Sequence, residues 1–213
     1  MDEKFIEQMR EAIVQGQVGE VTAMTNKALE TMAPLDIVTK IVAPAMGRVG
    51  DLYSCGEFYV PEMLLAARAA KAVLGVVRPM LAKGNVKPMA TVVIGTVRGD
   101  LHDIGKNLVS MMLEGAGFQV IDLGIDVPPE KFIQAVLENK ADLMGMSALI
   151  STTMPQMGVT IKEMEKAGVR NQVKVIVGGA PVTDEYAKSI GADGFAPDAA
   201  QAVTVSKRLL GLN

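Results

Sequence analysis

The chain has 213 residues, of which 49% are apolar and 21% are charged, and this composition excludes an intrinsically disordered protein. The net charge is −3, with basic and acidic residues spread along the chain, which argues against a nucleic-acid partner. No apolar stretch approaches the roughly 20 residues that a membrane-spanning helix needs, and the sequence does not open on a secretory signal. We therefore expect a folded, cytoplasmic protein without a membrane partner.

Two rare residues limit the metal chemistry of the chain. His102 is the single histidine and Cys55 the single cysteine. One cysteine cannot form an internal disulfide. One histidine and one cysteine also cannot supply the several side-chain ligands of a structural zinc site. A zinc site built from protein ligands is therefore not expected.

Residues 2–82 show helical periodicity only. Apolar residues recur every three or four positions in four successive stretches, and Pro34 and Pro61 stand where the third and fourth helices would begin. The stretches are Phe5, Ile6, Met9 and Ile13; Val21, Met24, Ala28 and Met32; Val38, Ile41, Val42, Ala45, Met46 and Val49; and Met63 to about Leu81. Four helices with short connections predict an all-α four-helix bundle.

A polar segment that contains Gly84 and Pro88 ends the helical part. We expect the bundle over residues 1–84, a linker over 85–89 and a second domain over 90–213. In the second domain β-rich runs alternate with helical stretches. The expected strands are 91–97, 118–123, 141–146, 173–177 and 194–196, and the expected helices are 104–114, 130–139, 156–167, 184–190 and 199–210. This alternation predicts an α/β doubly wound parallel sheet.

The residues that break the pattern follow the first, third and fourth expected strands. They are Gly99 to Asn107, Ser147 to Thr153, and Gly178 to Pro181. In a doubly wound sheet these three loops converge at the carboxyl ends of the strands, where such domains bind ligands. A neighbouring carboxylate, Asp100, could hold one ring nitrogen of His102 and leave the other for a ligand.

Three chemistries can be compared at these loops. A phosphate-binding Walker loop fails, because five residues separate Gly99 from Gly105 and Asn107 replaces the hydroxyl residue. A serine hydrolase is disfavoured, because neither Ser110 nor Ser147 has the flanking glycines of a nucleophile elbow. An axial histidine on a metal whose other ligands come from a macrocycle fits the single histidine.

At this point the motif resembles a known family. The pattern is Asp100-x-His102-x-x-Gly105, then 41 residues to Ser147-x-Leu149, then 28 residues to Gly178-Gly179. It resembles the cobalamin-binding signature of corrinoid proteins of multicomponent methyltransferase and demethylase systems, and of the cobalamin-binding module of methionine synthase. The resemblance implies a helical bundle cap followed by a flavodoxin-like five-stranded parallel sheet, and cobalamin or a related corrinoid as cofactor.

The resemblance also assigns expected roles to residues. His102 is the axial cobalt ligand, Asp100 holds its second nitrogen, and Thr153 extends this pair. Gly105 allows the nucleotide tail of the corrinoid to approach the backbone. Further expected corrinoid contacts are Asp103, Ile104, Ser147, Leu149, Gly178 and Gly179. Tyr53 and Val60 belong to the cap segment and are expected to shield the upper face of the corrin.

The implied function is methyl transport by a non-catalytic or co-catalytic subunit of an anaerobic O- or N-demethylase system. A substrate-specific methyltransferase would deliver a methyl group from methanol, a methylamine, a betaine or an aryl methyl ether to Co(I). A second methyltransferase would pass it to tetrahydrofolate or a thiol, and a reductive activase would restore Co(I). Three alternatives stay open: a cobalamin-dependent sensor or regulator, a corrinoid mutase subunit, and a flavodoxin-like nucleotide-binding domain.

Overall fold

The computed structural model describes residues 2–83 and 88–212. Residues 85–87 of the predicted linker lie outside the described residues. The chain divides into two compact units. The helical unit contains the chain up to Met89 together with Met111–Phe118, and the α/β unit contains Ala90–Ser110 and the chain from Gln119 onward. The prediction did not foresee that residues 111–118 group with the helical unit.

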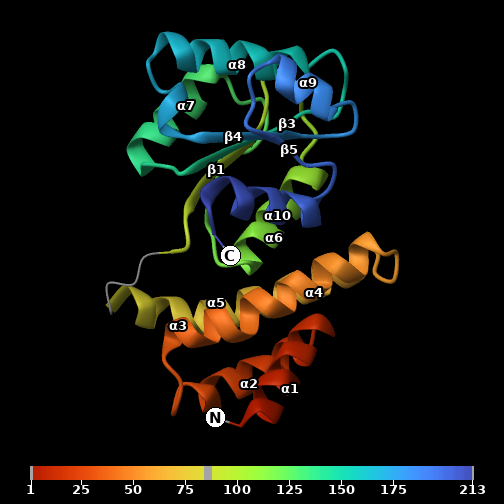
Figure 1. The fold of residues 1–213 in the computed structure, drawn as a ribbon, viewed down its shortest axis with the longest axis vertical. Helices are drawn as coiled ribbons and strands as arrows, with labels where there is room; N and C mark the ends of the chain where they lie inside the picture. The colour runs from red at the N-terminus through yellow and green to blue at the C-terminus, as the bar shows by residue number, and fades with distance from the viewer. Residues whose placement is uncertain (1, 84–87, 213) are drawn as a thin grey trace. The chain divides into compact units, whose positions relative to one another are not determined.

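The described residues up to Lys83 are helical, with short connections between the helices (Figure 1). Buried apolar side chains at helical spacing, such as Met9, Ile13 and Val21, form the core of this unit. The helices are α1 (Glu3–Val14), α2 (Val18–Ala28), α3 (Pro34–Ile37), the π-helical segment η1 (Val38–Val42), α4 (Ala43–Ser54) and α5 (Val60–Lys83). The predicted third helix is therefore one helical run, Pro34 to Ser54, with a π-helical segment inside it.

Pro44 gives the physical reason for the π-helical segment. A proline inside a helix has no N–H to donate to the carbonyl four residues earlier, and its ring clashes with that carbonyl. Here the affected carbonyl belongs to Lys40. The N–H of Ala43 donates to Val38, five residues back, which is the π-helical pattern. The local widening of the helix accommodates the proline ring.

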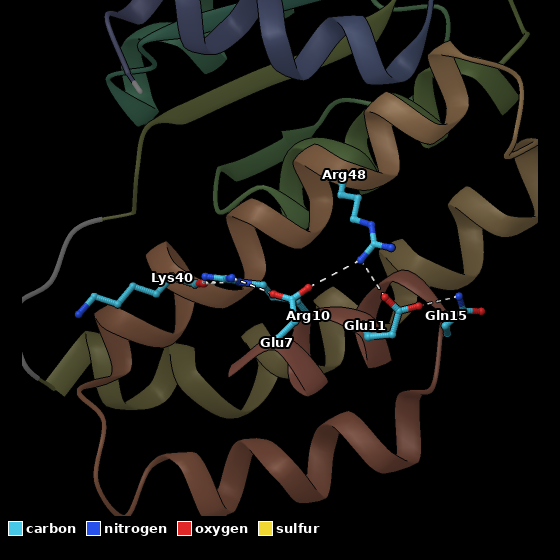
Figure 2. A network of polar contacts seen from close by, with 6 residues as sticks. All are labelled: Glu7, Arg10, Glu11, Gln15, Lys40 and Arg48. Atoms are coloured by element: carbon cyan, nitrogen blue, oxygen red, sulfur yellow. Dashed lines mark hydrogen bonds and ion pairs between the residues drawn. The ribbon is translucent and has the colours of Figure 1, made fainter. Parts of the chain in front are cut away.

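The Lys40 carbonyl receives its hydrogen bonds from another helix instead. Arg10 of α1 donates to it from Nε at 2.9 Å and from Nη2 at 2.7 Å (Figure 2). Arg10 also contacts Glu7 at 2.9 Å, and Arg48 of α4 pairs with Glu11 at 2.8 Å. These ion pairs are exposed, so water and salt screen them. The guanidinium of Arg10 thus satisfies the backbone group that Pro44 leaves without its helical donor.

The α/β unit is a five-stranded parallel sheet in the order β2-β1-β3-β4-β5. The strands are β1 (Thr91–Thr96), β2 (Gln119–Asp122), β3 (Leu143–Ser147), β4 (Lys174–Gly178) and β5 (Gly194–Phe195). The helices are α6 (Ile104–Gly115), α7 (Pro129–Asn139), α8 (Pro155–Lys166), α9 (Asp184–Ser189) and α10 (Ala199–Leu210), with a 3₁₀ turn at Arg170–Gln172. The predicted flavodoxin-like fold is confirmed, since this is the flavodoxin-like strand order.

Helices cover both faces of the sheet. Figure 1 shows α7 and α8 on one face, and α6 and α10 on the other. Under α7 and α8 the strands bury Val93, Met144 and Val175 against Phe132 and Ile161. The register places Thr96, Ser147 and Gly178 side by side at the carboxyl ends of β1, β3 and β4. The three loops that carry the unusual residues therefore leave the sheet at neighbouring points.

A membrane-spanning segment was not expected. Among the helices in residues 2–83 and 88–212, none is long and apolar enough to cross a membrane.

Candidate functional site

Asp100 is the centre of the polar contacts between the loops that follow β1 and β3. Its Oδ1 accepts the backbone N–H of His102 at 3.0 Å and lies 2.8 Å from Nδ1 of the same residue. Its Oδ2 accepts the backbone N–H of Leu149 at 2.9 Å and the hydroxyl of Thr153 at 2.6 Å. One carboxylate thus joins two loops that are about 50 residues apart in sequence.

The side chain of Asp100 is completely buried, at 0% exposure. Burial by itself raises the pKa of a carboxyl group and is the largest single influence here. The hydrogen bonds from Thr153, from the backbone and ring of His102 and from Leu149 together outweigh it, and they hold the pKa of Asp100 well below its ordinary value. Asp100 is therefore a buried carboxylate that stays ionised because four donors surround it.

The Asp100 carboxylate fixes both the tautomer and the direction of the His102 ring. An ionised carboxylate can only accept, so Nδ1 of His102 carries a proton toward it, and in the neutral ring the lone pair is then on Nε2. The His102 side chain is 52% exposed, and among the described residues none hydrogen-bonds Nε2. This is the arrangement of a metal-binding histidine whose second nitrogen is held by a carboxylate.

Gly105 lies in the first turn of α6, next to this histidine. Apart from the backbone of its own helix, a Cβ built at Gly105 would meet no atom of the described residues within 4 Å. Glycine costs helix stability, so the packing of the chain itself gives no reason for it here. Open space beside Gly105 matches the predicted close approach of a ligand to the backbone.

Exposed apolar side chains lie within two residues of His102 and on the loop that Asp100 joins to it. Ile104 is 84% exposed and Leu101 is 68% exposed, and Leu149 and Ile150 of the facing loop are also exposed. A group of exposed apolar residues around a polar centre is typical of a ligand-binding surface. Asp103, also predicted to contact the cofactor, is exposed, and its carboxylate accepts the side-chain amide of Asn107 at 3.0 Å.

The two predicted glycines at the end of β4 have a reason inside the chain. Gly179 has a φ of +128°, and a Cβ there would lie 1.9 Å from the carbonyl oxygen of Ala148. A Cβ at Gly178 would lie 2.7 Å from the carbonyl oxygen of Ala196. Neighbouring backbone therefore requires both glycines, and their contact with a corrinoid stays a prediction.

The remaining predicted residues lie apart from the Asp100 contacts. Ser147 ends β3, and none of the described residues hydrogen-bonds its hydroxyl, which leaves that group free for a ligand. Tyr53 lies in the last turn of α4 and is half-buried, and Val60 is the exposed first residue of α5. Their predicted role at the upper face of a corrin stays a prediction.

Two further residues hold the histidine loop and were not predicted from the sequence. The buried hydroxyl of Thr96 donates to the carbonyl of His102 at 2.9 Å. The carboxylate of Asp126 accepts the N–H of Gly99 at 2.6 Å. Asp126 follows a different strand, β2, so only the pairing of β1 with β2 brings it to this loop. The one sequence signal was a polar residue at the end of a neighbouring parallel strand.

These features fit a corrinoid. The Nε2 atom of His102 is an open nitrogen donor, the space beside Gly105 admits a ligand close to the backbone, and the exposed apolar residues match the edge of a macrocycle. One protein nitrogen would suffice, because a macrocycle would supply the other ligands of the metal.

Comparison with known proteins agrees with this assignment. Two family models described as B12 binding domain match residues 5–78 and 90–204. The chain is 40% identical to dimethylamine corrinoid protein 2 of Methanosarcina acetivorans, over 98% of this chain and 97% of that protein.

Two solved structures extend the likeness to both units of the chain. A cobalamin-binding protein from Desulfitobacterium hafniense is 30% identical over 98% of both chains, with a TM-score of 0.81. A chain of the methanol:cobalamin methyltransferase complex MtaBC from Methanosarcina barkeri is 27% identical, with a TM-score of 0.80, over 99% of this chain and 81% of that one. The fold and the comparisons thus define a B12-binding protein. The chain belongs to the corrinoid proteins of methyltransferase systems, and its cofactor is a corrinoid.

Proposed function

We propose that this chain is the methyl carrier of a methylamine-dependent methyltransferase system, with His102 as the lower axial ligand of cobalt. The observation that supports the proposal is the His102 ring, whose Nδ1 is held at 2.8 Å by a buried carboxylate while Nε2 is open. When bound, the corrinoid supplies a cobalt atom that accepts and releases a methyl group.

The residues of the site have separate tasks in this proposal. His102 offers Nε2 to the metal, and Asp100 keeps the proton on Nδ1 and the ring in one orientation. Thr153 and the N–H of Leu149 keep Asp100 ionised and in place. The exposed apolar side chains of Leu101 and Ile104 would exclude water from the space beside the ring once a corrinoid covers them. Tyr53 and Val60 are proposed to shield the opposite face of the corrin.

An N-methylated amine is the proposed methyl donor. Identity with the dimethylamine corrinoid protein is 40%, against 27% with the protein of the methanol complex. A methylamine methyltransferase is then the first partner, and a second methyltransferase that delivers the methyl group to a thiol or to tetrahydrofolate is the other. A reductive activase and a cytoplasmic location complete the proposal.

The ligand assignment is tested by reconstitution with hydroxocobalamin, desalting and an ultraviolet-visible spectrum, beside His102→Ala. We expect about one corrinoid per chain, as one site per chain requires, and a spectrum in His102→Ala that reports loss of the lower ligand. Retention of corrinoid with an unchanged variant spectrum would show that His102 is not the ligand.

The donor assignment is tested with the reduced, loaded protein and a purified dimethylamine methyltransferase. Dimethylamine, trimethylamine and methanol, each carrying a ¹³C methyl group, are offered separately. We expect protein-bound ¹³C-methyl corrinoid with an amine and none with methanol. In a parallel reaction, methanol is supplied together with a methanol methyltransferase. If the corrinoid is methylated from methanol and from neither amine, the proposed donor is wrong.

A further inference from the structure

Asp126 makes two hydrogen bonds to the loop that carries His102, and they run in opposite directions. Its carboxylate Oδ1 accepts the N–H of Gly99 at 2.6 Å, and its own N–H donates to the carbonyl of Asp100 at 3.0 Å. The two bonds hold the chain on both sides of the peptide group that joins Gly99 to Asp100. That peptide group directly precedes the buried side chain that orients the histidine ring.

The conformation of Asp126 indicates that its place is imposed by the fold. Its φ is +50°, in the left-handed region that favours glycine and that, among other residues, aspartate and asparagine adopt most readily. The next residue, Val127, is fixed by donation to the carbonyl of Thr96 at 2.9 Å and by a bridge to Val97. The backbone of Asp126 is therefore anchored to β1, and its carboxylate starts from a fixed point.

The loop itself needs such a restraint. Gly99 has a φ of +80°, and glycine has more conformational freedom to lose than any other residue. Without the Asp126 carboxylate, the described residues offer no other acceptor to the Gly99 N–H. Downstream, Thr96 holds the carbonyl of His102, so Asp126 and Thr96 restrain the two ends of the Gly99–His102 segment.

We propose that Asp126 is a positioning residue for His102, which sets the direction of Nε2 by holding the Gly99–Asp100 peptide group. This inference rests on the proposed role of His102 as cobalt ligand. Asp126 is itself exposed and far from complete burial, so its carboxylate adds little to the core of the α/β unit. Its effect is expected on the ligand geometry more than on folding.

Three variants separate the carboxylate from the backbone conformation. Asp126→Asn keeps an acceptor oxygen and tolerates the left-handed conformation. Asp126→Gly removes the acceptor but relieves any backbone strain, whereas Asp126→Ala removes the acceptor and keeps the strain. A role of the carboxylate predicts that the glycine and alanine variants share one defect at His102, although their stabilities differ.

Asp142 offers a matched control. Its carboxylate accepts the backbone N–H of Thr91 at 2.8 Å. This hydrogen bond lies in the same unit but at the amino ends of β1 and β3, whereas the site lies at their carboxyl ends. Asp142→Gly therefore removes the same kind of hydrogen bond without touching the histidine loop.

The single histidine gives a direct measurement. In tag-free protein labelled with ¹⁵N-histidine, every imidazole signal comes from His102. The cofactor-free protein reports the ring tautomer by NMR. Cobinamide, a corrinoid without a nucleotide base, is then bound and reduced to Co(II). Because cobinamide has no base of its own, an axial nitrogen seen by EPR comes from the protein. That nitrogen splits the Co(II) signal into two lines when it is ¹⁵N and into three when it is ¹⁴N.

We expect the ratio of histidine-ligated to unligated Co(II) to fall about tenfold in Asp126→Gly and Asp126→Ala. It should stay within about threefold of the parent in Asp126→Asn, since a neutral acceptor remains, and should be unchanged in Asp142→Gly. The tautomer that protonates Nδ1 should lose population in the same two variants. A ratio and tautomer in Asp126→Gly equal to those of the parent would overturn the inference.

The two proposals fail in different ways. If the parent protein shows no axial nitrogen from ¹⁵N-histidine, the proposed ligand role of His102 is wrong. The tautomer measurement on cofactor-free protein still decides whether Asp126 orients the ring, because it needs no corrinoid. A shifted tautomer in Asp142→Gly as well would show that any loss of stability disturbs the ring, which also overturns the specific role of Asp126.

Discussion

Pro44 in the helical unit and Gly105 in the α/β unit are both poor choices for a helix, and the chain treats them differently. Around Pro44 the helix widens into a π-helical segment, and Arg10 donates to the carbonyl that the proline leaves without its helical donor. Around Gly105 nothing compensates: the space where a side chain would stand is open. Contacts within the chain explain the proline and leave the glycine unexplained.

The difference teaches how to separate structural residues from ligand-binding ones. A residue that breaks a local rule and is compensated by its neighbours belongs to the fold. A residue that breaks a rule without compensation and lies beside an open donor atom, as Gly105 lies beside His102, supports a group outside the chain. Gly179 is of the first kind, since the carbonyl of Ala148 requires it, and the exposed Ile104 is of the second. Asp100 belongs to both kinds. Its carboxylate receives all its hydrogen bonds from the chain, but the His102 ring that it orients has no partner for Nε2 among the described residues.

Gly179→Ala should have the largest effect on folding. The new Cβ would lie 1.9 Å from the Ala148 carbonyl at a φ of +128°, so backbone must move. We expect a loss of about 4 kcal/mol or more in the free energy of unfolding, from strain and overpacking together. Urea denaturation measures it. Gly168→Ala, at a φ of +70° with open space around the Cβ, should lose only about 1 kcal/mol; equal losses would contradict the steric reason.

Asp100→Ala should come second. It leaves the Thr153 hydroxyl and the N–H of Leu149 without their acceptor in a buried place. We expect a loss of about 3 kcal/mol in the free energy of unfolding of the cofactor-free protein. Asp36→Ala, which removes an exposed pair with Lys40, is the control and should cost less than about 0.5 kcal/mol. If the two losses are alike, burial does not decide the importance of these carboxylates.

Arg10→Ala should cost about 1–2 kcal/mol, because the Lys40 carbonyl loses a charged donor. The cost should fall by about 1 kcal/mol in a Pro44→Ala background, where residue 44 regains an N–H for that carbonyl. A thermodynamic cycle of the two variants in urea measures this coupling. Additive effects would show that Arg10 acts through its ion pair with Glu7 alone.

Gly105→Ala should have the smallest effect on stability and a clear effect on the cofactor. With no atom near the new Cβ, and a better helix former in α6, we expect the cofactor-free protein to gain about 0.5 kcal/mol. Corrinoid affinity should fall about tenfold, because the methyl group fills the space that the ligand needs. Titration with hydroxocobalamin compares the variant with the parent. An unchanged corrinoid affinity would show that Gly105 has no role in ligand binding.

Much of the fold follows from local patterns in the sequence. The alternation of β-rich runs with helical stretches predicted every strand and helix of the α/β unit within a few residues, because buried parallel strands are continuously apolar. The stripes of residues 2–82 predicted helices, but the π-helical segment was missed. Its cause, Pro44, is visible in the sequence, whereas only packing brings Arg10 to the Lys40 carbonyl, 30 positions away.

The site divides in the same way. Asp100, His102 and Gly105 lie within six residues, so one short motif of the sequence contains the proposed ligand, its carboxylate partner and the glycine to which the resemblance assigns a cofactor contact. Thr153 could also be predicted from the sequence, as a hydroxyl residue on a second loop. Thr96 and Asp126 could not, because their partners are backbone groups, which every residue has, and a polar residue near the end of a strand does not by itself identify its partner.

The sequence by itself determined the two kinds of structure in the chain, the end of the sheet where the candidate site lies, and the single histidine that is the proposed ligand. These follow from periodicity, strand polarity and composition, which are local properties. Only the tertiary structure decided which carboxylate oxygen faces which donor, which glycines the backbone itself requires, and that Asp126 holds the histidine loop. Such contacts join distant segments at hydrogen-bond distance, and they are fixed when parallel strands pair and bring their carboxyl ends together.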